Sequence, residues 1–258
     1  YDPVDLAVDI YQTTGGDDPI MTQADYAADS HMRPTEVKKY YDGAVYMKKF
    51  LEFIGAPENN FNIIKESKVW SLFYEMGKSL SKNFGDDSES QVRKNETMNS
   101  YFGVILYQIH VGVSGNTART HIREYGKNVV NSVGNEDFND DVADIVDDLS
   151  ESLQDDEIHT TSDLMKSLTD ENDTVEALGD TFDTYMRNAR NSESVDKFIR
   201  NIKQNVKYYH DLNEDGGLVG SLRYNEVSED QLKELQKYMR DLNQLSEELF
   251  SKYGDEIR

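Results

Sequence analysis

The residues with the clearest potential for chemistry are polar and basic side chains between Thr22 and Tyr41. Four of them are of the types that reach phosphates and base edges in a DNA major groove, namely Arg33, Thr35, Lys38 and Lys39. Residues 31–50 carry five lysines and arginines against two acidic residues, inside a chain whose formal net charge is −23. This local reversal of charge indicates a contact with duplex DNA.

A second basic group follows Asn116. Arg119, Arg123 and Lys127 are spaced by four residues, which places them on one face of a helix. Such a stripe predicts contacts to a phosphate backbone away from the first basic segment. Salt bridges to nearby carboxylates are the alternative, because charges at this spacing are common on helix surfaces.

One segment resembles a calcium-binding loop. Asp211, Asn213 and Asp215 alternate ahead of two glycines, as in the first positions of an EF-hand loop, but position twelve is Leu222 instead of a bidentate carboxylate. The alternative is an Asx-rich connection after a helix. We therefore keep calcium as a candidate ligand here and expect no dedicated metal site.

Catalytic patterns are missing from the sequence. The chain contains no phosphate-binding glycine loop, no zinc-protease motif and no nucleophile elbow, and its five histidines do not cluster. Cysteine is absent, which excludes disulfides and thiolate chemistry. We expect a protein that is not an enzyme and that uses no cofactor.

The basic segment has the pattern of a helix-turn-helix. Thr22 can cap a first short helix, Ala27 is small enough for two helices to touch, and Val37 follows ten residues later. The second helix, beginning at Pro34, should then present Arg33, Thr35, Glu36, Lys38 and Lys39 outward. The alternative is an ordinary helical hairpin within a bundle.

Residues 2–54 resemble the central DNA-binding domain of ParB-type partition proteins. Asp2-Pro-Val-Asp-Leu-Ala7 is similar to the family's Asn-Pro-Ile-Glu-x-Ala helix, and Pro19–Ala27 is similar to its Leu-Thr-Gln-x-x-Ile-Ala segment. Val37 falls where the family has the valine of its recognition helix. The resemblance implies that Gln23 and the start of the Pro34 helix face DNA in a plasmid or chromosome partition protein.

Two further expectations follow from this resemblance. The family's nucleotide-binding domain lies upstream of the matched segment, so we expect this chain to be part of a longer protein. His31 stands where the family has a turn glycine, so this residue must adopt a left-handed or adjusted conformation.

The fold class is predicted to be all-α. Apolar residues recur every three or four positions along most of the chain, and there are only four prolines. Tyr101–Val111 is apolar on all sides, so it is either a buried helix or a strand. We expect a helix-turn-helix region at 1–55, a helical core at 60–133 with the second DNA contact, and an acidic multi-helix bundle at 134–258.

Charge is divided unevenly between the two halves. Residues 1–133 carry 14 basic and 18 acidic side chains, whereas residues 134–258 carry 13 and 32. The acidic half is either a well-solvated surface or a docking face for a basic protein partner. The second interpretation leads to an alternative function for the chain, as an acidic interaction module or DNA mimic that does not contact DNA. The last helix has a heptad-like stripe, from which a homodimer is one hypothesis. The alternative is that the stripe packs on the core of its own chain. No apolar run approaches a membrane span, so we expect a soluble, cytoplasmic chain without membrane contact.

Overall fold

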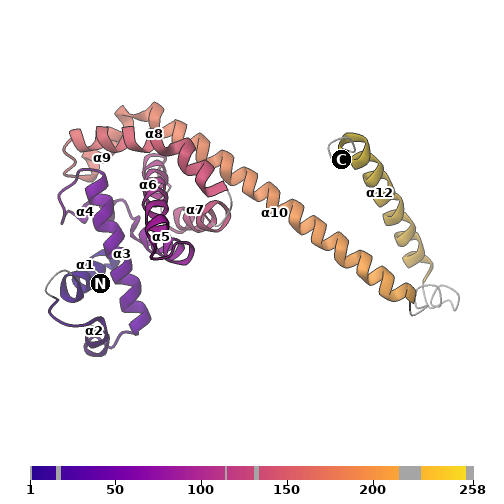
Figure 1. Cartoon of the computed structure of the whole chain (residues 1–258), viewed down its shortest axis with the longest axis horizontal. Helices are drawn as coiled ribbons and strands as arrows, with labels where there is room; N and C mark the ends of the chain where they lie inside the picture. Colours follow the sequence, from indigo (N-terminus) through magenta and orange to yellow (C-terminus); the bar gives the residue numbers. More distant parts are fainter. Residues whose placement is uncertain (1, 16–18, 114, 131–133, 215–227, 254–258) are drawn as a thin grey trace. The chain divides into compact units, whose positions relative to one another are not determined.

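The computed structural model describes residues 2–15, 19–113, 115–130, 134–214 and 228–253. These residues form helices joined by turns, without a strand among them, which confirms the predicted all-α class (Figure 1). The elements are α1 Pro3–Thr14, α2 Gln23–Asp29, α3 Pro34–Phe53, α4 Asn62–Glu66, α5 Trp70–Asn83, α6 Ser88–His110, α7 Gly115–Tyr125, the π-helix η1 Gly126–Val130, α8 Gly134–Asp155, α9 Thr161–Asp170, α10 Asn172–Glu214 and α12 Glu229–Tyr253.

Several helices begin at the residues that the sequence predicts. The Thr22 hydroxyl accepts a hydrogen bond from the Asp25 amide at 3.1 Å and so caps α2. Pro34 occupies the first turn of α3, where a missing N–H is harmless. Ser228 and Gln231 form a capping box ahead of α12, with reciprocal hydrogen bonds of 2.9 and 3.2 Å.

The apolar segment Tyr101–Val111 belongs to a helix. Residues Tyr101–His110 form the second half of α6, which packs against α5, α8 and α9, and Val111 is its C-terminal cap. Every residue from Ser100 to Leu106 is buried. A helix surrounded by other helices buries all its faces, so this segment lacks the polar stripe of a surface helix.

Aromatic side chains join the central helices into one core. The ring centroid of Phe50 on α3 lies 5.2 Å from that of Phe73 on α5 and 5.5 Å from that of Phe102 on α6. Tyr125 of α7 lies 5.2 Å from Phe138 of α8. These contacts make the acidic helix α8 part of the same core as the helices that precede it.

The chain divides into two compact units, unit 1 at Tyr1–Ser192 and unit 2 at Glu193–Arg258. This division differs from the expected boundaries near Gly55 and Gly134. It differs because α8, α9 and the first part of α10 bury their apolar faces on the central helices, as Leu149, Leu164 and Leu178 illustrate. Residues Asn172–Glu214 form the single long helix α10.

Candidate nucleic-acid interface

The first three helices enclose a small core of their own. Ile10 of α1, Ala27 of α2 and Val37 of α3 are its buried centre. The side chains packed around them are Leu6, Tyr26, Met32, Tyr40 and Tyr41. Ala27 is 3% exposed, so a larger residue would separate the two helices that meet there. Figure 1 shows α1 and α2 beside the start of α3, with α8 and α9 on the other side of unit 1.

The turn between α2 and α3 depends on His31. His31 has a φ of 56°, which is a left-handed conformation. The sequence predicts this conformation, because His31 stands at a turn position that glycine would otherwise occupy. The ring Nδ1 lies 3.1 Å from the carbonyl oxygen of Ala28, and the next amide, of Met32, donates to the carbonyl of Ala27 at 3.0 Å. These bonds end α2 and turn the chain into α3.

Three of the five predicted DNA contacts lie on the open side of this turn. Arg33, Thr35 and Lys38 are exposed, while Gln23 is half-buried at the first position of α2. The Lys38 ammonium lies 3.1 Å from Asp42, one turn further along α3. The Lys38 side chain is 69% exposed, and such surface pairs contribute at most about 1 kcal/mol. Lys38 can therefore exchange Asp42 for a phosphate at little cost.

The sequence predicts that Lys39 points outward, but in the structure it does not. Its ammonium lies 5.3 Å from the ring centroid of Trp70 and 5.0 Å from that of Tyr74, both on α5. The Tyr40 and Trp70 rings are stacked at 5.3 Å beneath it. The π faces of these rings attract the cation, and the side chain is half-buried as a result.

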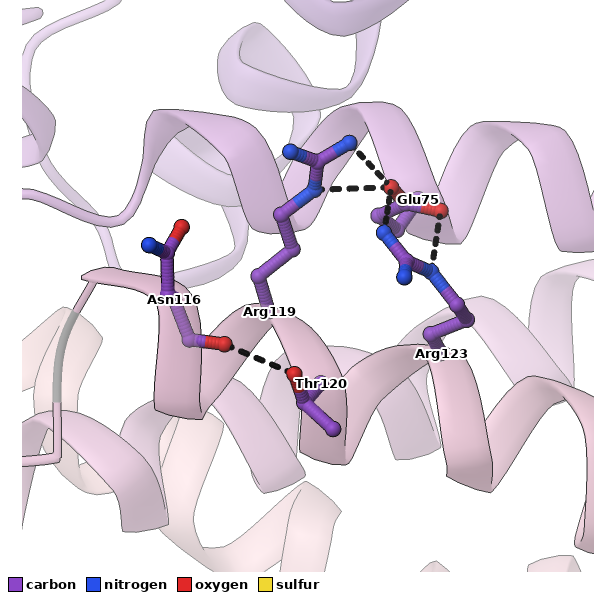
Figure 2. A network of polar contacts seen from close by, with 5 residues as sticks. All are labelled: Glu75, Asn116, Arg119, Thr120 and Arg123. Carbon is purple, nitrogen blue, oxygen red and sulfur yellow. Dashed lines mark hydrogen bonds and ion pairs between the residues drawn. The ribbon is translucent and has the colours of Figure 1, made fainter.

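Two members of the second predicted group, Arg119 and Arg123, contact the buried carboxylate of Glu75 (Figure 2). Glu75 of α5 accepts from the Arg119 Nε at 2.8 Å and from an Arg123 terminal nitrogen at 2.9 Å. The Glu75 side chain is 5% exposed, whereas the two arginines are 36% and 56% exposed. The structure therefore contains the salt bridges that were the alternative to phosphate contacts for these two arginines. A single carboxylate pairs with both cations.

The charge state of Glu75 follows from these contacts. Burial raises the pKa of its carboxyl, but hydrogen bonds from Arg123 and Arg119 and their positive charges outweigh burial and hold the pKa below its usual value. Glu75 is consequently ionised near neutral pH, and it fixes both guanidinium groups against α5.

Lys127, the third member of the predicted stripe, lines a cavity of about 150 Å³ between α5, α7 and η1. Four of the lining residues are basic, namely Lys78, Lys82, Arg123 and Lys127. A second cavity of about 390 Å³ lies at the start of α5 and α7, and its lining includes Lys65, Lys68, Trp70 and Arg119.

Four lysines that line these cavities, Lys65, Lys68, Lys78 and Lys82, are not among the residues that the sequence predicts. Lys78 and Lys82 do have helical i,i+4 spacing, but nothing in the sequence places them beside Arg123, about 40 residues away. The structure links the cations of α3 and α7 through α5. Lys39 contacts Trp70, Trp70 lines a cavity with Arg119, and Glu75 joins Arg119 to Arg123.

The calcium candidate finds no support in the part of the chain that the structure describes. Asp211 and Asn213 lie in α10, whose helical backbone continues to Glu214, so the predicted loop is helix at its first positions. Asp215 lies outside the described residues. Elsewhere in the described ranges, no three histidine, aspartate or glutamate side chains are grouped to hold a metal ion.

The described helices include none that is long and apolar enough to cross a membrane. Comparisons of this chain with protein-family models, with curated proteins and with solved structures find no match.

Proposed function

We propose that unit 1 binds duplex DNA through α2 and α3, in the manner of the ParB-type partition proteins that residues 2–54 resemble. One observation carries the proposal. The small core of Ile10, Ala27 and Val37 fixes α2 against α3 and leaves the first turn of α3 exposed. An exposed helix start held by its own three-helix core is the geometry with which a helix-turn-helix enters the major groove.

In this proposal the contacts divide by role. Arg33 and Thr35 reach base edges from the first turn of α3, and Lys38 contacts a phosphate beside them. Gln23, at the first position of α2, lies where the preceding helix of such a motif crosses the DNA backbone. The exposed edges of Arg119 and Arg123 add a weaker attraction for the phosphates further along the duplex.

A second candidate function rests on the acidic surface of α8. Nine carboxylates lie between Gly134 and Asp155 without one basic residue, and all nine side chains are exposed. Residues 134–192 as a whole carry 18 acidic and three basic side chains. Such a surface repels DNA and attracts a basic protein partner, so we propose it as a docking face that also confines DNA to the opposite helices.

Unit 2 supplies a different surface, which we propose pairs with a second copy of this chain. On α12, Leu235, Met239 and Leu242 follow a four-three spacing and are 41%, 53% and 53% exposed. The helix carries six acidic and four basic residues, so it lacks the strong repulsion of α8. A heptad stripe flanked by charges of both signs is the pattern with which coiled coils self-associate.

Fluorescence anisotropy with a labelled mixed-sequence duplex, across a salt series, tests the DNA proposal. We expect binding whose logarithm of affinity falls linearly with the logarithm of salt concentration, because contacts to phosphates release counterions. No binding at low salt would contradict a DNA-binding function for this chain and would favour the acidic docking face.

A further inference from the structure

We propose that the cavity between α5, α7 and η1, termed here the lysine cavity, is a binding site for a phosphate group. Its wall includes the carboxylate of Glu75 and the cationic side chains of Lys78, Lys82, Arg123 and Lys127. The site is separate from the α2–α3 turn, and the ligand class is a phosphate ester or pyrophosphate. The inference does not depend on the helix-turn-helix proposal.

The wall of the lysine cavity has an excess of positive charge. Four cationic side chains surround one carboxylate, in a chain with 50 acidic and only 27 basic residues. That carboxylate, Glu75, already accepts hydrogen bonds from Arg119 and Arg123. Among the described residues, Lys78 and Lys82 have no acidic partner. Cations held together at this density repel one another, and a bound anion removes the repulsion.

The shape and the neutral groups of the lysine cavity suit the same ligand. About 150 Å³ gives room for several water molecules, and therefore for a phosphate group. The Asn83 amide nitrogen donates to the carbonyl of Ser79 at 2.9 Å and to its hydroxyl at 3.3 Å, which fixes the Ser79 hydroxyl at the wall. A hydroxyl and an amide beside lysine and arginine are typical partners of phosphate oxygens.

The wall opposite α5 is a π-helix that is held very close to it. A Cβ at Gly126 would lie 2.7 Å from both the Ser79 Oγ and the Tyr101 hydroxyl, so a larger residue would have to displace these side chains. The turn Gly126–Val130 places Lys127 beside Arg123, whose guanidinium is already fixed by Glu75. π-Helical turns are rare in proteins, and those that do occur are often found at functional sites. Arg123 is held before a ligand arrives, so its guanidinium loses less entropy on binding than a free side chain would.

Calorimetric titration of the full chain with inorganic pyrophosphate, at constant ionic strength, tests the proposal. The site variant is K82Q/K127Q, which removes two exposed lysines without changing the core. The matched control is K94Q/K166Q, which removes the same charge from α6 and α9. We expect affinity for pyrophosphate to fall about tenfold or more in K82Q/K127Q, since each lysine supplies a charge-assisted hydrogen bond, and to change little in the control.

Two results would overturn the proposal. One is the lack of any pyrophosphate binding by the unmodified chain at millimolar concentration, and the other is an equal loss of affinity in both variants. Equal melting temperatures of the variants and the unmodified chain, measured by circular dichroism, confirm that each variant is folded.

A second experiment, in which the same variants bind duplex DNA, distinguishes a phosphate of DNA from a free phosphate compound. If the phosphate belongs to DNA, K82Q/K127Q weakens duplex binding and lowers its salt dependence, and pyrophosphate competes with the duplex. If the ligand is a free phosphate compound, K82Q/K127Q and the control bind duplex equally. Pyrophosphate binding without any duplex binding would contradict the helix-turn-helix function while supporting the lysine cavity.

Discussion

Glu75 of α5 and Arg119 of α7 are joined by a 2.7 Å ion pair between residues 44 positions apart in the chain. Arg123 binds the same carboxylate from the next turn of α7. One buried side chain thereby orients two arginines that the sequence assigns to a surface stripe. The pairing couples the stability of unit 1 to the electrostatics of both cationic cavities.

Replacing Glu75 should make unit 1 less stable and less sensitive to acid. The pKa of Glu75 is lowered in the folded chain, so its stabilising effect is complete above the unfolded pKa of about 4.3 and is lost as the pH falls through the folded value. E75Q should lower the free energy of unfolding at pH 7 by about 1–3 kcal/mol and reduce its loss below pH 4.5 or so. Urea denaturation followed by the fluorescence of Trp70, the single tryptophan, measures both effects. An unchanged pH profile would contradict this assignment.

Removing two cations from the start of α3 should weaken DNA binding. R33A/K38A deletes a base-edge candidate and a phosphate candidate, and we expect a loss of about 1–3 kcal/mol in binding free energy with a salt slope smaller by about one. The matched control is K49A/K166A, in which both lysines are exposed and lie away from the α2–α3 turn. Fluorescence anisotropy measures the difference. Equal affinities of the two variants would exclude Arg33 and Lys38 from the interface.

The turn between α2 and α3 should tolerate glycine and reject a β-branched residue. His31 has a φ of 56°, which costs a non-glycine residue about 1–2 kcal/mol relative to a right-handed conformation. H31V should therefore be less stable than the unmodified chain, since valine strongly disfavours this region, while H31G should be at least as stable. Thermal unfolding by circular dichroism ranks the three proteins. A valine variant as stable as the glycine variant would show that the turn relaxes.

Gln108 is a buried amide whose replacement should stabilise the fold. The side chain is 1% exposed, and neither its nitrogen nor its oxygen has a partner among the described residues. Q108M keeps a similar shape and removes the cost of leaving both groups unpaired, so stability should rise by about 1 kcal/mol. The urea midpoint at constant m-value is the measurement.

A second buried amide provides the control. Asn139 accepts from Ser100 at 2.8 Å and donates to Thr97 at 3.0 Å, so N139L should lower the urea midpoint. If Q108M lowered it as well, Gln108 would have a partner in solution, such as a water molecule.

Self-association through α12 should depend on its apolar stripe. M239E/L242E places two charges on the stripe and should shift the sedimentation coefficient from dimer to monomer, because buried charges without partners oppose association. Q244E/S251E adds the same charge at exposed positions outside the four-three stripe and should leave the dimer intact. Monomers in the unmodified chain at high concentration would contradict the proposed pairing.

Much of the fold was predictable because its signals are local. The spacing from Ala27 to Val37, the cap at Thr22 and the box at Ser228 and Gln231 involve near neighbours, and the structure contains each of them. Helix periodicity is equally local, since it depends on residues three or four apart. The exposed positions of Arg33, Thr35 and Lys38 follow directly from that periodicity.

The sequence by itself therefore determined an all-α chain with a helix-turn-helix pattern and an acidic second half. Only the tertiary structure decided that Lys39 lies over Trp70, that Arg119 and Arg123 share Glu75, and that Lys78 and Lys82 meet Lys127. The physical reason is the separation along the chain over which each interaction acts. Helix formation and capping are set within one or two turns, whereas the partner of a charge depends on which distant helix the core packs beside it.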